Sequence, residues 1–200
     1  MKGHDLIQHL SRALAAPLVE SSDFSLNPRV ELNPARVVRK AGVLVGVTDG
    51  PTGAQIILTK RSSKMEHHPG QVAFPGGKVE PFDADITATA LREAQEEVGL
   101  HPDLVQVLGQ LPGHETGTGF HITPTLAYVR PGFSPIPQDS EVEEIFTVPL
   151  SHLGNLSRYR IEASDWRGGN WSYFAVPWGP YYIWGATARI LHALARRLNE

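Results

Sequence analysis

A glycine turn that leads into an acidic helix, between residues 74 and 100, constrains this chain more than any other feature. The segment begins with Phe-Pro-Gly-Gly and ends with Arg-Glu-Ala-Gln-Glu-Glu-Val-Gly-Leu. In the expected helix Glu93, Glu96 and Glu97 are spaced i, i+3 and i+4, so their carboxylates share one face about one turn long. Because like charges this close repel, the cluster favours a hard divalent cation, Mg2+ or Mn2+, among its oxygen atoms.

The alternative is a solvated acidic face, which is the usual explanation of an isolated Glu-x-x-Glu-Glu. The surrounding residues favour a built site instead. Asp83 and Asp85 stand where helix caps are expected, and Gly99 supplies a stop. Arg92 lies beside the cluster and can hold a carboxylate by a charge-assisted hydrogen bond. The opposite flank carries apolar residues at helical spacing: Ala90, Leu91, Ala94 and Val98.

The run from Arg92 to Leu100 resembles the signature of the Nudix hydrolases, in which Arg-Glu-apolar-any-Glu-Glu-any-Gly-apolar follows a leading glycine, here Gly77. The chain departs from that signature in two ways. Asp83 stands where the family has Glu, and the interval between Gly77 and Arg92 is one residue longer than the standard box. An extra residue at this place is typical of the subfamily that hydrolyses coenzyme A.

Residues upstream of the helix resemble the same subfamily. Residues 58–63 read Leu-Thr-Lys-Arg-Ser-Ser, and residues 68–77 read His-Pro-Gly-Gln-Val-Ala-Phe-Pro-Gly-Gly. Glu66 is a mismatch, because relatives tend to carry a basic residue there, and it bears on substrate affinity rather than on the reaction type. Shorter similarities follow at residues 119–124, 140–142 and 182–187.

The resemblance implies a catalytic site on the acidic helix. Glu93 and Glu97 would be the first metal ligands, Glu96 the next, and the carbonyl oxygen of Gly76 would complete the shell. Nudix enzymes often bring a downstream acidic residue to the metal ions, and Glu141 is the best candidate for that ligand or base, although an exposed acidic turn explains it as well. The predicted catalytic residues are Glu93, Glu96, Glu97, Arg92 and Glu141.

Coenzyme A has three phosphates, so a protein that selects it needs positive charge near the box. Lys60, Arg61, Lys64 and His68 can supply this charge. Ordinary loop chemistry is the better explanation of Lys64, whereas we predict a substrate role for Arg61 and His68. The predicted substrate-binding residues are Arg61, Lys60, His68 and Gly77. The four tryptophans are expected to anchor the core and turns rather than to stack on bases.

Composition limits the classes of partner. Lys and Arg total 18 against 21 for Asp and Glu, and a net charge of -3 offers no general attraction for nucleic acid. The absence of cysteine excludes disulfides, thiolate zinc sites and a cysteine nucleophile, and it fits a cytoplasmic protein. Apolar runs stay short of the roughly 18 to 20 residues that span a membrane, so we expect no membrane association. A small-molecule substrate is the expected partner, and a homodimer is possible.

Strand and helix patterns alternate in an order that predicts an α+β fold, and the resemblance specifies a Nudix-type α/β/α sandwich with a mixed sheet and a loop-helix-loop box. We divide the chain into an N-terminal helix and linker, residues 1–36, and a Nudix domain, residues 37–200. Strands are expected at residues 41–47, 55–60, 72–74, 104–111, 123–129, 145–148, 159–162 and 171–176. Further helices are expected near residues 150–153 and 187–198.

The predicted function is therefore metal-dependent hydrolysis of the diphosphate of coenzyme A into 3',5'-ADP and 4'-phosphopantetheine, with the acyl and oxidised forms of coenzyme A as further candidate substrates. One alternative is a Nudix hydrolase for ADP-ribose, NADH or a nucleoside triphosphate. Another is a module that senses a nucleotide without cleaving it.

Overall fold

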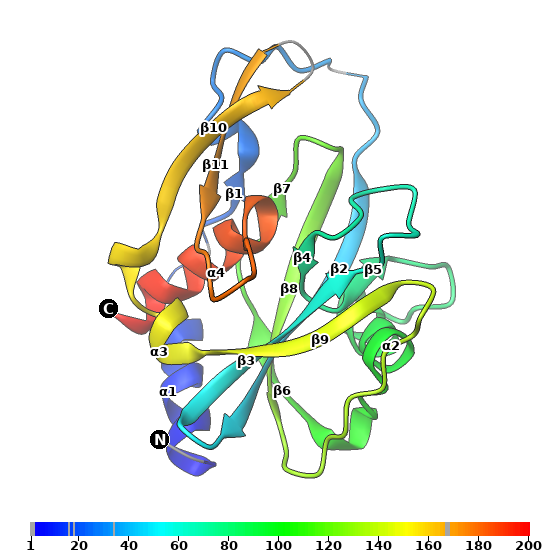
Figure 1. The fold of residues 1–200 in the computed structure, drawn as a ribbon, viewed down its shortest axis with the longest axis vertical. Helices are drawn as coiled ribbons and strands as arrows, with labels where there is room; N and C mark the ends of the chain where they lie inside the picture. Colours follow the sequence, from blue (N-terminus) through cyan, green and yellow to red (C-terminus); the bar gives the residue numbers. More distant parts are fainter. Residues whose placement is uncertain (1–2, 16, 18, 34, 167–168) are drawn as a thin grey trace.

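The computed structural model describes residues 3–15, 17, 19–33, 35–166 and 169–200 (Figure 1). The helices are α1 (His4–Ala15), α2 (Ile86–Val98), α3 (Leu150–Leu153) and α4 (Gly185–Leu198), with short 3-10 turns η1 (Asp23–Ser25), η2 (Pro102–Leu104) and η3 (Leu156–Arg158). The strands are β1 (Ser21–Ser22), β2 (Arg39–Gly50), β3 (Gly53–Arg61), β4 (Val72–Ala73), β5 (Gly76–Lys78), β6 (Val105–Gln110), β7 (His114–Glu115), β8 (Phe120–Val129), β9 (Val142–Pro149), β10 (Arg160–Trp166) and β11 (Gly169–Ala175).

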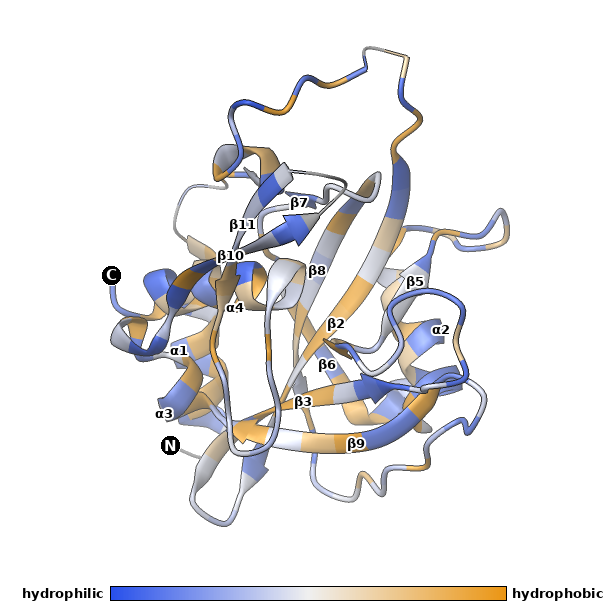
Figure 2. Cartoon of the chain, turned by 45° about the horizontal axis from the view of Figure 1, so that its top comes forward, coloured by the Kyte–Doolittle hydropathy of each residue, from blue (hydrophilic) through white to orange (hydrophobic). Residues whose placement is uncertain are grey.

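A mixed sheet organises the molecule around β2. This strand runs parallel to β8 and antiparallel to β3, and β9 pairs antiparallel with β3 from Gln55 to Arg61. The strands predicted at residues 41–47 and 55–60 are confirmed as β2 and β3, which form a hairpin with Pro51 and Thr52 between them. Figure 2 shows β2 changing from hydrophilic at its exposed start to hydrophobic in the middle of the sheet, where the strand is buried.

Helices cover both faces of the sheet, so the predicted α/β/α sandwich with a mixed sheet is confirmed (Figure 1). On one face α1 and α4 enclose the larger core, which includes the fully buried side chains of Leu10, Leu58 and Leu191. On the other face α2 contributes Ala90, Ala94 and Val98 to a second core. The apolar stripe predicted on α2 therefore packs against the sheet, with Leu91 at its half-buried edge.

The N-terminal helix packs against α4 and β6, and Leu6 and Leu10 have 0% exposure. The segment predicted as a linker contains β1 and η1, two short elements that its sequence did not predict. Asp23 ties this segment to the sheet, because its carboxylate bonds His114 Nε2 at 3.1 Å and accepts from Gly117 N at 2.8 Å. The boundary between residues 36 and 37 stays a prediction.

The late strands β10 and β11 form a separate two-stranded sheet in which Arg160 pairs with Ala175. Figure 1 shows this hairpin beside α4, away from α2. No helix among the described residues is long and apolar enough to cross a membrane.

Candidate active site

The acidic helix α2 begins and ends where its sequence predicts. Asp85 is the N-cap, and its side chain accepts a hydrogen bond from Ala88 N at 2.8 Å. Gly99 takes the left-handed conformation, with φ 71°, and ends the helix. Between these caps α2 lies beside β5 (Figure 1), where Glu97 accepts a hydrogen bond from Gly76 N and Glu93 lies against Gly77.

Glycines bring α2 against the sheet. A Cβ on Gly42 would lie 2.5 Å from Ile86 O, so only glycine lets β2 approach the first turn of the helix this closely. On β5, which pairs with β2, a Cβ on Gly77 would lie 2.4 Å from Glu93 Oε1. Gly76 N donates to Glu97 Oε2 at 3.0 Å. On β5, Gly76 therefore binds the Glu97 carboxylate, and Gly77 leaves space for the Glu93 carboxylate.

Arg92 organises the carboxylates through an ion-pair network. Its Nη1 donates to Glu93 Oε1 at 2.9 Å and to Glu96 Oε2 at 3.0 Å. The other side of the guanidinium binds both oxygens of Asp83, at 2.9 and 3.1 Å. The Arg92 guanidinium and two further donors hold the pKa of Asp83 well below its usual range, and Asp83 in turn raises the pKa of Arg92.

The cap predicted at Asp83 is therefore wrong, since Asp85 caps the helix. Asp83 instead accepts hydrogen bonds from Arg92, from Thr89 Oγ1 at 2.8 Å and from Glu80 N at 2.9 Å. Its side chain is only 3% exposed. The sequence carried one signal of this role, because Asp83 occupies the position where the resembling family has Glu.

Glu97 is the most perturbed acid of the site. Its burial raises the pKa to about 8, and the negative charges of Glu93 and Glu141 act in the same direction. The hydrogen bond from Gly76 and the charge of Arg61 oppose this shift. Burial also raises the pKa of Glu93, with Glu96 and Glu141 adding to it and Arg92 opposing it. Glu141 thus lies close enough to Glu93 and Glu97 to influence both, and its role as a ligand or base stays a prediction.

The ends of β3 and β9 place Arg61 and Glu141 at this region. The backbone N–H of Ser62 donates to Glu141 O at 2.8 Å, and the register shifts between Lys60 and Arg61, so that Arg61 pairs with Val142. A bulge of this kind redirects side chains. The Nε atom of Arg61 is buried without a hydrogen-bond partner among the described residues.

Lys60 and His68 do not join the carboxylates. Both line a neighbouring pocket, and Lys60 Nζ forms an ion pair with Glu143 at 2.6 Å. Burial lowers the pKa of His68, and the nearby charges of Arg61 and His67 lower it further. The adjacent Glu144 accepts a hydrogen bond from the Tyr181 hydroxyl. Of the predicted substrate-binding side chains, only Arg61 therefore lies with the acids.

The donor set fits a divalent cation by its chemistry. It consists of carboxylate oxygens, and burial raises the pKa of Glu93 and Glu97, so that their charged forms favour a positive partner. Among the residues that the structure describes, however, no three His, Asp or Glu side chains are grouped as a ready metal-binding set. Arg92 engages Glu93 and Glu96, and the Glu96 side chain is 54% exposed. Metal binding thus requires these carboxylates to turn away from Arg92.

A second set of residues that sequence reasoning missed lines the neighbouring pocket. Gln71, Tyr181, Tyr182 and Trp184 contribute to its walls. Trp184 was predicted to be a structural anchor, and it does precede α4 as its N-cap residue. It also lines the pocket, which the sequence did not predict because β4 and the segment before α4 are far apart along the chain.

Comparison with known proteins places the chain in a family. Residues 38–167 match the NUDIX domain family. The chain is 41% identical over 187 residues to a protein described as "Uncharacterized Nudix hydrolase NudL" from Photorhabdus laumondii subsp. laumondii, which covers 91% of this chain and 100% of that protein. A protein of the same description from Cronobacter sakazakii is 40% identical over 162 residues, covering 81% and 84%. The chain belongs to the Nudix family.

A solved structure shows the same fold at low sequence identity. The crystal structure of a MutT/nudix family protein from Enterococcus faecalis has a TM-score of 0.51 and 13% identity, and the match covers 100% of this chain and 76% of that one. At this identity the likeness concerns the fold alone.

Proposed function

We propose that this Nudix protein hydrolyses the diphosphate linkage of coenzyme A to 3',5'-ADP and 4'-phosphopantetheine, using Mg2+ or Mn2+. The observation that carries the proposal is that Glu93, Glu97 and Glu141 lie near the guanidinium of Arg61, whose Nε atom is buried. The acids suit cations, and the guanidinium suits a phosphate. A diphosphate bound between them would join the two halves of the site.

Bound divalent cations would screen the phosphates and acidify a water molecule. Glu93 and Glu97 would hold them first, with Glu96 and the carbonyl oxygen of Gly76 completing the set. Arg92 holds Glu93 and Glu96 in the metal-free protein, and Asp83 would keep its guanidinium beside the site once those carboxylates turn to the cations. Glu141 would accept the proton of the attacking water or serve as a further ligand, and general-base assistance is worth about 100- to 10,000-fold in rate.

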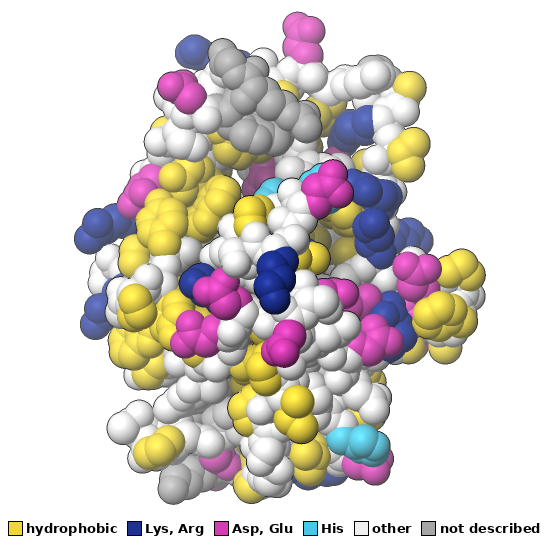
Figure 3. All heavy atoms as spheres, turned by 45° about the vertical axis from the view of Figure 1, so that its right-hand side comes forward, with side chains coloured by type: hydrophobic (Ala, Val, Ile, Leu, Met, Phe, Trp, Pro, Cys, Tyr) yellow, Lys and Arg dark blue, Asp and Glu magenta, His cyan; other side chains and the backbone are white. Residues whose placement is uncertain are grey.

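Arg61 would bind a phosphate oxygen. Its Nε is buried and has no hydrogen-bond partner among the described residues, and a buried donor of this kind is costly unless a ligand satisfies it. The choice of coenzyme A over other diphosphates rests on the sequence resemblance at residues 58–77, which form the end of β3, β4, β5 and the loop between them. Figure 3 shows acidic and basic side chains interspersed on the face that the view brings forward.

A substrate panel tests the proposal. Coenzyme A, acetyl coenzyme A, ADP-ribose, NADH and a nucleoside triphosphate are incubated with the protein and Mg2+, and products are separated by chromatography. We expect 3',5'-ADP from the coenzyme A compounds at the highest kcat/KM. Rapid cleavage of another diphosphate beside negligible cleavage of coenzyme A would overturn the substrate. Tight binding without any product in Mn2+ would favour a sensing module.

A further inference from the structure

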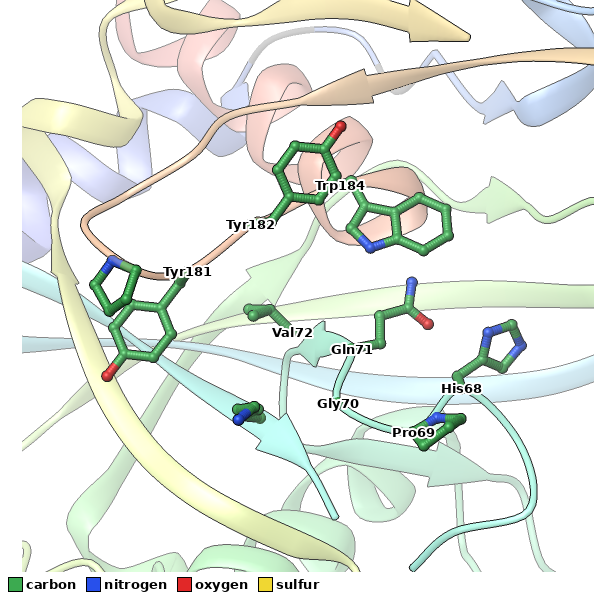
Figure 4. A pocket seen from close by; sticks show the side chains of 10 residues that line it. His68, Pro69, Gly70, Gln71, Val72, Tyr181, Tyr182 and Trp184 are labelled. Carbon is green, nitrogen blue, oxygen red and sulfur yellow. The ribbon is translucent and has the colours of Figure 1, made fainter. Parts of the chain in front are cut away.

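A pocket of about 340 Å3 lies beside the end of β3, next to the acids of α2 but without any of them in its wall. Figure 4 shows Tyr181, Tyr182 and Trp184 on one side of the pocket and His68 and Gln71 on the other. The two sides come from segments that are more than a hundred residues apart, and the Thr187 hydroxyl joins them by donating to Val72 O at 3.0 Å.

The aromatic wall is held in place by contacts behind it. The ring of Tyr181 stacks on Phe146 with centroids 3.6 Å apart and an interplanar angle of 6°. Trp184 makes an edge contact with Tyr173 at 5.1 Å, and the Tyr182 hydroxyl donates to Glu162. Rings that are already ordered lose little conformational freedom when a ligand stacks on them.

The opposite wall carries two polar side chains without a partner. Neither the Gln71 amide nor the His68 ring forms a hydrogen bond with another described residue. The backbone around them is fixed, since Arg61 N donates to Gln71 O at 3.0 Å and Gly70 N donates to Arg61 O at 3.1 Å. His68 has a positive φ of 54°, which is uncommon outside glycine and occurs often at ligand sites.

The charge of the pocket favours a neutral ligand group. Lys60 is the one cationic side chain among the residues that line it, and its ammonium group is paired with Glu143. His68 has a lowered pKa, so it is mainly neutral near pH 7. A wall of this composition suits a flat polar ring better than a phosphate.

We infer that this pocket binds the adenine base of the nucleotide half of the substrate, which stacks on the aromatic wall and pairs with the Gln71 amide. The side-chain amide of glutamine offers one donor and one acceptor, which match the N7 and N6 atoms of adenine. The inference rests on the proposed function, because the attached diphosphate would pass the end of β3 to reach Arg61 and the acids. Lys60 on that strand lines the pocket, and the next residue influences Glu97.

Binding of single substrate fragments tests the inference independently of turnover. Isothermal calorimetry with 5'-AMP, 5'-IMP and 4'-phosphopantetheine is performed on the wild type, Gln71→Leu, Tyr182→Leu and the control Gln106→Leu, a half-buried glutamine on β6. Hypoxanthine keeps N7 but lacks the N6 donor. We expect the wild type to bind AMP about 10-fold more tightly than IMP, and Gln71→Leu to abolish this preference.

Tyr182→Leu removes a stacking surface and is expected to weaken AMP and IMP alike, by about 5- to 50-fold. Its side chain is 42% exposed, so the variant keeps the core intact if Gln71→Leu does not fold. Gln106→Leu is expected to bind as the wild type does. Any of three results would overturn the inference. The wild type shows no measurable AMP binding, Gln71→Leu keeps the preference for AMP over IMP, or the variants weaken binding of 4'-phosphopantetheine while AMP binding is unchanged.

Coenzyme A cleavage is followed in the same samples. We expect Gln71→Leu to raise KM about 10-fold while kcat stays within twofold, because the base is bound away from the reacting phosphates. Failure of the wild type to cleave coenzyme A would overturn the proposed substrate, whereas the AMP and IMP result would decide on the pocket.

Discussion

Glu97 carries the largest conflict between burial and charge in the site. Its side chain is almost fully enclosed and two further acids influence it, yet among the described residues only the N–H of Gly76 donates a hydrogen bond to it. A carboxyl group in this environment prefers to keep its proton unless a cation replaces it. The pKa of about 8 is therefore a property of the metal-free protein, and metal binding is expected to lower it.

This conflict predicts the pH dependence of stability. The folded pKa of Glu97, about 8, lies above its ordinary value of 4.5, so its contribution to stability is complete below pH 4.5 and is lost as the pH rises to 8. In EDTA, we expect Glu97→Gln to gain a few kcal/mol of unfolding free energy relative to the wild type between pH 5 and pH 8, roughly 1.4 kcal/mol per pKa unit. Urea unfolding at both pH values measures this difference. If the difference in unfolding free energy between Glu97→Gln and the wild type were the same at pH 5 and pH 8, the burial of the Glu97 charge would be contradicted.

Asp83 presents the opposite case, since Arg92 stabilises its charged form. We expect Asp83→Asn to destabilise the protein by about 1 to 3 kcal/mol at pH 7, because a largely buried guanidinium loses its bidentate partner. Asp103→Asn is the control, as its side chain is 90% exposed. Since the folded pKa of Asp83 lies below its ordinary value of 3.8, the difference should shrink as the pH falls below that value. Equal unfolding curves for both variants at pH 7 would refute the role of Asp83.

Among the elements, α2 lies close to the sheet because the facing strands have glycine at two positions. Gly42 faces the backbone of α2, and Gly77 faces a side chain of α2. A methyl group on Gly42 would meet backbone, Ile86 O, whereas one on Gly77 would meet the flexible end of Glu93. The same substitution should therefore have different consequences at the two positions.

We expect Gly42→Ala to lower the unfolding free energy by about 2 kcal/mol or more, because helix and strand must separate. Gly77→Ala should instead cost less than about 1 kcal/mol while lowering kcat at least 10-fold, since it displaces a carboxylate of the site. Chemical unfolding and steady-state kinetics of both variants separate these effects. Full activity in Gly77→Ala would show that the position of Glu93 beside β5 does not matter.

The sequence predicted those elements that are long enough to display a hydrophobic periodicity or a capping residue. The acidic helix, its stop at Gly99, the first two long strands and the last helix were predicted correctly. The strands β1, β5 and β7 have two or three residues each, too few for alternation to appear, and tertiary pairing creates them. In the site, helical spacing predicted that the glutamates lie together. The sequence did not predict the bulge between Lys60 and Arg61, which directs these two side chains to different places.

At the scale of the whole molecule, the N-terminal helix belongs to the packing of the domain. Leu10 is fully buried in the core that α1 and α4 enclose. We expect Leu10→Ala to lower the unfolding free energy by about 2 to 5 kcal/mol, because it removes buried methyl groups and leaves a cavity. Val19→Ala is the control, with 73% exposure. A loss below about 0.5 kcal/mol in urea unfolding would indicate that the helix is not part of the cooperative unit.

The central claim is tested most directly by titrating the wild type, Glu93→Gln and Glu97→Gln with Mn2+. Electron paramagnetic resonance follows the bound ion, and coenzyme A cleavage is measured in the same samples. The account predicts that the wild type binds Mn2+ and cleaves coenzyme A, and that each variant keeps its fold, binds Mn2+ at least about 10-fold more weakly and loses nearly all turnover. Near-native turnover at saturating Mn2+ in either variant would contradict it.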